Sequence, residues 1–164
     1  MPEKETIRKA RQDKREGKSP STQAGEFVHE EIEHIRHGKH GARSTKQAIA
    51  IGLSKARRAG VKLPPPSEGR ASAETRKQAK RDLAKRKSHS KPSAKRSRAS
   101  RAALKDESRS SASSAALSRQ ATTAARKRSA TSRRNAALKA AKTKGPAVRH
   151  RAAVKAARTR AAAH

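Results

Sequence analysis

The stretch STKQAIAIGLSKARRAG, residues 44 to 60, carries the clearest helix signals in the chain. Ser44 and Gln47 have the spacing of a capping box, in which the serine hydroxyl accepts a hydrogen bond from the backbone N–H three residues later. Gly60 is placed to end the helix in a left-handed turn, and the three prolines from 64 to 66 prevent its continuation. Residues 44–60 are therefore predicted to form one helix.

The predicted helix is apolar along one side. Ile49, Leu53 and Ala56 share a ridge, because residues three or four apart lie on the same helix face. Gly52 lies beside this ridge, although glycine costs about 1 kcal/mol of helix propensity relative to alanine. We therefore expect a second helix to approach closely at Gly52. Ile51 lies among the basic residues on the other side.

The residues before this helix predict its packing partner. Ser19 followed by Pro20 favours a helix start, and Gly38 favours a helix stop. The linker to the next helix is short, so residues 20–37 and 44–60 are predicted to form an antiparallel helical hairpin in a mainly α protein. The residues expected to pack in this hairpin are Phe27, Val28, Ile32, Ile35, Ile49, Leu53 and Ala56.

The first predicted helix contains the histidine-rich sequence FVHEEIEHIRHGKH, residues 27 to 40. His29 and His34 are five residues apart and point about 140° away from each other on a helix, so they cannot bind one ion together. Glu31 and His34 match part of a di-iron carboxylate site, but that site needs further pairs from other helices. No metal site, cofactor or catalytic residue is therefore predicted. Glu31 falls within the apolar stripe, where we expect it to pair with a base of the facing helix or to lie at the rim.

Composition limits the folded part of the chain. There are 44 Lys and Arg residues against 13 Asp and Glu, a net charge of +31, with one Phe and no Trp, Tyr or Cys. Apolar burial cannot offset a backbone ordering cost of about 1–2 kcal/mol per residue along such a chain. We therefore expect a helical module at residues 20–66, between a frayed basic arm at 1–19 and a polycationic tail at 67–164.

The tail is rich in Ala, Ser, Lys and Arg and is expected to be largely disordered or conditionally helical. AALKAAKTK from Ala136 recurs as AAVKAARTR from Ala152, and such segments should form helices once phosphates neutralise their charge. Breaks are expected near Gly145 and Pro146 and in the serine-rich residues 108–114. A module this small should also be completed by a helix from the arm or tail, or by dimerisation through Ile51.

The dense cations predict a polyanionic partner. Bases every two or three residues can neutralise phosphates and release condensed counterions. Scarce aromatic residues argue against stacking on single strands, and Asn135 is the only asparagine available to read a base. Binding to a duplex backbone is therefore favoured over single-strand recognition, and binding without sequence specificity is expected. Duplex DNA is the expected partner, with RNA as the alternative.

The residues expected to contact phosphate lie in the second predicted helix and along the tail. They are Arg43, Lys46, Lys55, Arg57, Arg58, Lys85, Arg86, Lys87, Lys95, Arg96, Arg98, Arg126, Lys127, Arg128, Arg133, Arg134, Lys139, Lys142, Lys144, Arg149, Arg151, Lys155, Arg158 and Arg160.

Two resemblances support this interpretation. Residues 17–66 resemble the core of a family of small basic proteobacterial proteins of unknown function, some labelled plasmid stabilization proteins. The likeness is closest over HGARSTKQAIAIGLSKARRAGVKLP, residues 40–64, and it implies a role in DNA maintenance. The tail resembles, in composition, the tails of linker histones and bacterial histone-like proteins.

The sequence therefore predicts a nucleoid-associated, histone-like DNA-binding protein of the bacterial cytoplasm. RNA or ribosome association is one alternative, and a protein adaptor that uses the hairpin is another. No enzyme is expected, because the serines lack placed partners and no phosphate-binding glycine loop occurs. No membrane contact is expected either, since no apolar run approaches the ~18 residues of a membrane span.

Overall fold

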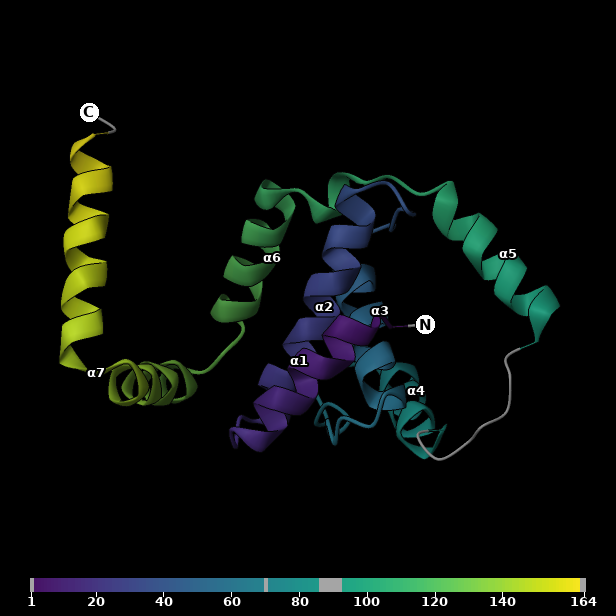
Figure 1. Ribbon diagram of the computed structural model, residues 1–164, viewed down its shortest axis with the longest axis horizontal. Helices are drawn as coiled ribbons and strands as arrows, with labels where there is room; N and C mark the ends of the chain where they lie inside the picture. Colours follow the sequence, from purple (N-terminus) through teal and green to yellow (C-terminus); the bar gives the residue numbers. More distant parts are fainter. Residues whose placement is uncertain (1, 70, 86–92, 163–164) are drawn as a thin grey trace. The chain divides into compact units, whose positions relative to one another are not determined.

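The computed structural model describes residues 2–69, 71–85 and 93–162, with only the backbone described for residues 143 and 144. Within these residues the chain is helical and contains no strand, which confirms the mainly α class (Figure 1). It divides into two compact units, residues 1–120 and 121–164. None of the described helices combines the length and apolar character that crossing a membrane requires.

Helices α2 (Pro20–Arg36) and α3 (Thr45–Arg58) form the centre of the first unit and lie side by side (Figure 1). The hydroxyls of Ser19 and Ser44 cap them, each accepting a hydrogen bond from the backbone N–H three residues later, at 3.4 and 3.2 Å. Gly38 and Gly60 follow the two helices with φ of +74° and +100°. The expected caps and stops are therefore confirmed.

The core of the first unit has two apolar clusters on α2 and α3. One cluster joins Ala24 and Phe27 with Ala56 and Val61, and it also receives Ala10. The second cluster comprises Ile32, Ile35, Ala42, Ala48 and Ala112. Of the remaining residues expected to pack, Val28 and Leu53 are partly buried against these clusters and Ile49 is half-buried.

Gly52 permits the close approach of the two helices. A Cβ atom at this position would lie 2.7 Å from Val28 Cα and 3.0 Å from the carbonyl oxygen of Phe27. These are backbone atoms of α2, so they cannot rotate aside as the end of a side chain could. The loss of helix propensity at Gly52 is therefore compensated by packing, as the sequence indicates.

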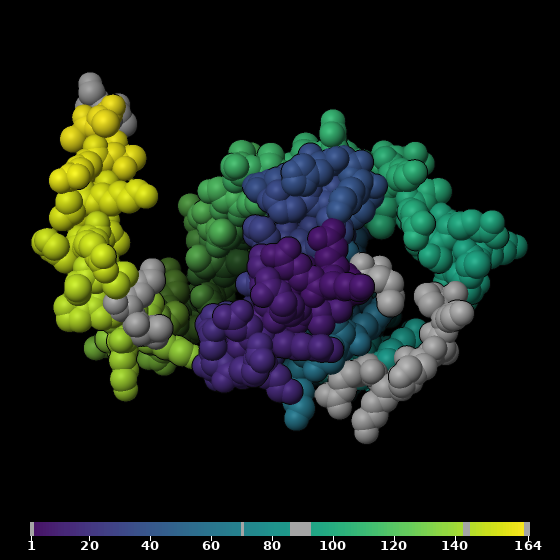
Figure 2. Space-filling view, viewed as in Figure 1, coloured from purple at the N-terminus to yellow at the C-terminus, as the bar shows by residue number. Residues whose placement is uncertain are grey.

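Helix α1 (Lys4–Arg15) corrects the expectation of a frayed arm. It lies against α2, as the space-filling view shows, and it buries Ala10 beside Phe27 (Figure 2). Its start is fixed by Glu3, whose backbone N–H donates to Glu30 Oε2 at 3.1 Å. The Glu3 carboxylate accepts hydrogen bonds from Lys39 and His34, which lower the pKa of Glu3 to about 2. Polar anchors therefore order a segment with little apolar surface.

Helix α4 (Ala73–Ala84) lies within the part of the chain expected to be a tail. It packs on α3 and buries Ala79 and Asp82. The Asp82 carboxylate accepts hydrogen bonds from Ser54 at 2.7 Å and from Arg58 at 3.0 Å. This helix therefore completes the α2–α3 pair through a buried acid, which the count of net charge overlooked.

A second tail segment, residues 104–112, hereafter the strap, is held against the end of α2 and the start of α3. It contains the short 3-10 helix η2 (Ser110–Ala112), whose Ala112 is buried in the second cluster. Four donors bind its carbonyl oxygens at 2.7–3.1 Å: Gly41 N–H to Leu104, Ala42 N–H to Ser108, Thr45 Oγ1 to Ser111 and Arg36 Nε to Ala112. Backbone carbonyls thus dock a sequence that composition alone assigned to disorder.

Three further helices occupy the remaining described tail: α5 (Ala94–Lys105), α6 (Ser114–Arg126) and α7 (Ala130–Ala161). Their presence corrects the expectation of a largely disordered tail, because alanine with Lys and Arg favours the helix. Gly145, with φ of +67° and ψ of 168°, breaks α7 just before Pro146. The expected break at this position is therefore confirmed.

The Gly52→Ala substitution tests the helix contact. It should lower the free energy of unfolding by about 1–3 kcal/mol, because the new methyl group must push α2 away from α3. The control is Gly25→Ala, at an exposed position of α2 with nothing within 4 Å of the new Cβ. The control should raise stability by about 0.5–1 kcal/mol. Thermal unfolding followed by circular dichroism separates the two, and an upward shift in both would contradict the close approach.

The Gly41→Ala substitution tests the strap. A Cβ at Gly41 would overlap the backbone carbonyl of Glu107, 1.8 Å away, so the strap must move off. Hydrogen exchange should then become faster at the amides of Gly41 and Ala42 and in peptides that cover residues 104–117. Gly25→Ala, which crowds nothing, should leave exchange in these peptides unchanged. Unchanged protection in the Gly41 variant would show that the strap does not dock as described.

Candidate nucleic-acid interface

The second unit concentrates positive charge without any acidic side chain. Residues 121–164 contain thirteen Lys and Arg and no Asp or Glu. Most of this charge lies on α7, whose two segments meet at Gly145. Twelve bases of this unit that were expected to contact phosphate are exposed. They are Arg126, Lys127, Arg128, Arg133, Arg134, Lys139, Lys142, Arg149, Arg151, Lys155, Arg158 and Arg160.

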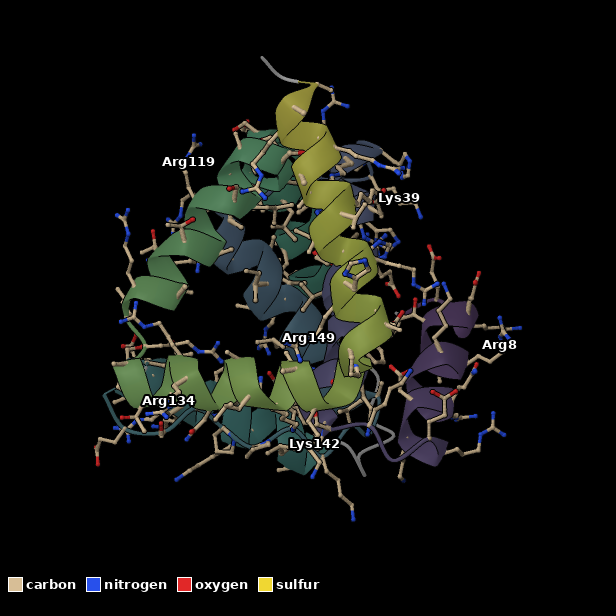
Figure 3. All side chains as sticks on the ribbon, turned by 90° about the vertical axis from the view of Figure 1, so that its left-hand side faces the viewer. Arg8, Lys39, Arg119, Arg134, Lys142 and Arg149 are labelled. Carbon is tan, nitrogen blue, oxygen red and sulfur yellow. The ribbon has the colours of Figure 1, made fainter. Side chains whose placement is uncertain are left out.

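The bases of α7 surround the helix and do not form a single stripe. Arg133 and Arg134 are adjacent in sequence and therefore lie about 100° apart around the helix axis. Lys142 points in a third direction. Figure 3 shows basic side chains leaving the ribbon in several directions, with Arg134, Lys142 and Arg149 labelled. A helix charged all round has no face adapted to base edges, but it can meet phosphates on any side.

Three bases on α3 that were expected to contact phosphate, Lys55, Arg57 and Arg58, instead bind groups within the first unit. Arg57 is only 7% exposed, and its guanidinium donates to the carbonyl oxygens of Leu63 at 3.3 Å and Pro64 at 3.4 Å. Burial lowers the pKa of Arg57 from its usual value, and the charge of Asp82 opposes this effect. Arg58 pairs with Asp82 at 3.0 Å while its side chain remains half exposed.

Lys55 lies in the middle of a buried acidic pair. Its Nζ is 2.6 Å from Glu31 Oε2 and 3.3 Å from Glu30 Oε1, and the Glu31 side chain is 1% exposed. Of the two expectations for Glu31, pairing with the facing helix is the one observed. Desolvation raises the pKa of Glu30, but hydrogen bonds from Thr6 and from the Glu3 backbone, together with Lys55, outweigh it and leave that pKa lowered.

The first unit nevertheless exposes bases. Arg43 and Lys46 are exposed at the start of α3, and Lys85 is exposed after α4. Lys95, Arg96 and Arg98 are exposed on α5. Arg86 and Lys87 lie outside the described residues, as does the side chain of Lys144.

A hollow of about 740 Å³ in the first unit gathers bases from several elements. Arg58 of α3 and Arg96 of α5 line it together with Lys39 and Arg101. Sequence reasoning did not single out Lys39 or Arg101. Helical spacing does not pair Arg101 with Arg96, because residues five apart point about 140° away from each other on a helix. Nothing local indicates that Lys39 lies beside them either.

One group of metal-type side chains lies close together in the described residues. The ligand atoms of Glu31, His34 and His40 all lie within 4.8 Å of one another. Sequence reasoning missed this group because it compared histidines along one helix, and His40 comes from the loop that follows.

Comparison with known proteins adds one match. A family of unknown function (DUF6496) matches residues 14–67, about a third of the chain, which covers α2, α3 and their connecting loop. No curated protein and no solved structure matches the chain. The similarity therefore concerns the α2–α3 region, and it assigns no activity to it.

The Lys55→Met substitution tests whether this base holds the first unit together. It should lower the free energy of unfolding by about 3–5 kcal/mol, because Glu30 and Glu31 remain buried without their cation. Adding Glu31→Gln to this variant should recover part of the loss. Lys46→Met, at an exposed position of the same helix, should change stability by at most about 0.5 kcal/mol. Urea denaturation measures all four chains, and equal losses at Lys46 and Lys55 would contradict the buried pairing.

Proposed function

We propose that the protein binds duplex DNA through its phosphates, without sequence specificity, and uses the second unit as its main contact surface. The observation that carries this proposal is the unit's charge: thirteen bases, no acidic side chain, and exposure along almost the whole of α7. Such a surface repels itself and is stabilised by a polyanion. In the first unit, in contrast, several bases form ion pairs with acidic side chains of the same unit.

The α2–α3 region has a different role in this proposal. It acts as an antiparallel hairpin that arranges the basic helices, and DNA binding strengthens the helices of the tail. The proposal also assigns the protein to the bacterial nucleoid. The likeness of residues 17–66 to proteins labelled plasmid stabilization proteins favours a role in DNA maintenance. Dimerisation through Ile51, which lies half-buried in α3, stays a prediction.

The chemistry of the surface favours backbone contact over base reading. Alanine fills most positions between the bases of α7, and neither asparagine nor aromatic side chains are available in number. Phosphate contacts of this kind fix affinity and are nearly independent of base sequence. About ten simultaneous contacts would give a slope of about −9 for the logarithm of the binding constant against the logarithm of salt concentration.

Fluorescence anisotropy with labelled duplexes of two unrelated sequences, from about 50 to 200 mM salt, tests the proposal. The two duplexes should bind equally, with a steep negative slope. Replacing Arg133, Arg134, Lys142 and Arg149 by Gln should reduce the magnitude of the slope by about 3–4, since each contact contributes about 0.9.

The matched control removes the same charge from α1, where Glu5 and Asp13 accompany the bases. Replacing Arg8, Arg11, Lys14 and Arg15 by Gln should change the slope by less than half as much. Affinity that does not depend on salt, or equal effects of the two sets, would contradict the assignment to the second unit. Stronger competition by structured RNA than by duplex DNA, at equal phosphate concentration, would replace DNA by RNA as the partner.

A further inference from the structure

The histidine-rich sequence 27–40 places three metal-type ligands together in a way that phosphate binding does not explain. Glu31 and His34 lie one turn apart on α2. Beyond the end of α2 at Arg36, Lys39 N–H donates to the carbonyl oxygen of His34 at 2.9 Å. This turn reverses the chain and brings His40 beside the last turns of α2, so the three ligand atoms lie within 4.8 Å of one another.

The carboxylate of Glu31 is buried and incompletely satisfied. The residue is 0% exposed, and its Oε1 accepts no hydrogen bond. Oε2 forms an ion pair with Lys55 Nζ at 2.6 Å. Oε1 has His40 Nε2 as its neighbour at 3.4 Å, which is longer than a usual hydrogen bond. One oxygen of a buried carboxylate is therefore aimed at an imidazole nitrogen without bonding to it.

The other nitrogen of His40 fixes the chemistry of this contact. His40 Nδ1 lies 3.0 Å from the carbonyl oxygen of Gly41, which can only accept, so Nδ1 carries the hydrogen. In the neutral ring Nε2 then presents a lone pair to Glu31 Oε1. Two acceptors that face each other in a buried site can be satisfied by a proton on the imidazole nitrogen or by a cation bound between them. Metal-binding histidines commonly donate their second N–H to a backbone carbonyl in this way.

The spacing of the two acceptors suits a metal ion. Ligands bound to zinc at about 2.0–2.1 Å in tetrahedral geometry lie about 3.3–3.4 Å apart. The Oε1 to Nε2 distance between Glu31 and His40 is 3.4 Å, so these two atoms already have that spacing. His34 is the third ligand, and the Glu3 carboxylate, 2.8 Å from its Nε2, can orient the ring as carboxylates do in metal sites.

We propose that Glu31, His34 and His40 bind one divalent transition-metal ion of the zinc class. Two imidazoles and a carboxylate suit zinc, cobalt and nickel better than magnesium or calcium, which prefer oxygen ligands. Three protein ligands leave a fourth position for water. The site tethers the loop that carries His40 to α2, and it is independent of phosphate binding by the second unit.

Lys55 distinguishes a metal site from a merely structural cluster. Its ammonium group neutralises Oε2 of Glu31, so a metal ion at Oε1 must be bound beside a like charge. Removing that charge should strengthen metal binding, even though it weakens the protein without metal. A cluster that serves only packing would show no such gain.

Zinc titration of the full-length chain, in competition with a chromophoric chelator, tests the proposal. One zinc ion per chain should bind and raise the Tm, and cobalt should give the intensified visible absorption of nitrogen and oxygen coordination. His34→Ala and His40→Ala should each weaken zinc binding at least tenfold. The controls His29→Ala and His37→Ala remove exposed histidines of the same region and should leave affinity unchanged.

Lys55→Met gives a readout of the opposite sign. Zinc should bind this variant several-fold more tightly and raise its Tm more than that of the unaltered chain. The proposal is wrong if the unaltered chain shows no stoichiometric zinc binding and no cobalt absorption. It is also wrong if all four histidine variants lose affinity equally, or if Lys55→Met gains neither affinity nor Tm from zinc.

Discussion

The close approach of α2 and α3 at Gly52 is the constraint on which the first unit depends. With one Phe and no Trp or Tyr in the chain, area per contact is small, so backbone proximity replaces large side chains. Once the two helices lie together, their outer surfaces can receive α1 and α4, and the loop between them can receive the strap. Each of these additions brings a few apolar atoms and several polar bonds. The result is a core in which alanines and a few larger apolar residues lie beside buried ion pairs.

The features of the fold that could be predicted from the sequence are those set by residues close together in the chain. Ser19, Gly38, Ser44 and Gly60 announce the ends of α2 and α3 because capping and left-handed turns depend on residues within a few positions. Helix α1 could not be recognised in this way, since Glu3 is anchored by residues some thirty positions further along the chain. The strap could not be predicted either, because it is held through backbone carbonyl oxygens, which every residue has whatever its side chain.

The candidate interface shows the same limit for charged residues. Composition and spacing identified the basic helices of residues 121–164, where no acid competes. They could not separate Lys55, Arg57 and Arg58 from exposed bases, because their partners Glu31, the carbonyl of Leu63, and Asp82 are known only from the fold. His40 was overlooked for a related reason, since ligands were sought at helical intervals and it comes from a loop. The sequence alone does not show which group a charged side chain or a histidine faces, because that depends on the tertiary fold.

The interruption of α7 at Gly145 bears on how a basic rod can follow a curved polymer. Thirty-two residues of unbroken helix would be about 48 Å long and nearly straight, so its ends would leave the surface of a duplex that winds beneath it. Two shorter rods, each about 22–24 Å, depart much less from such a path. On the proposed duplex, a single glycine with positive φ before a proline would thus replace one long straight helix by two shorter segments that can each follow the surface.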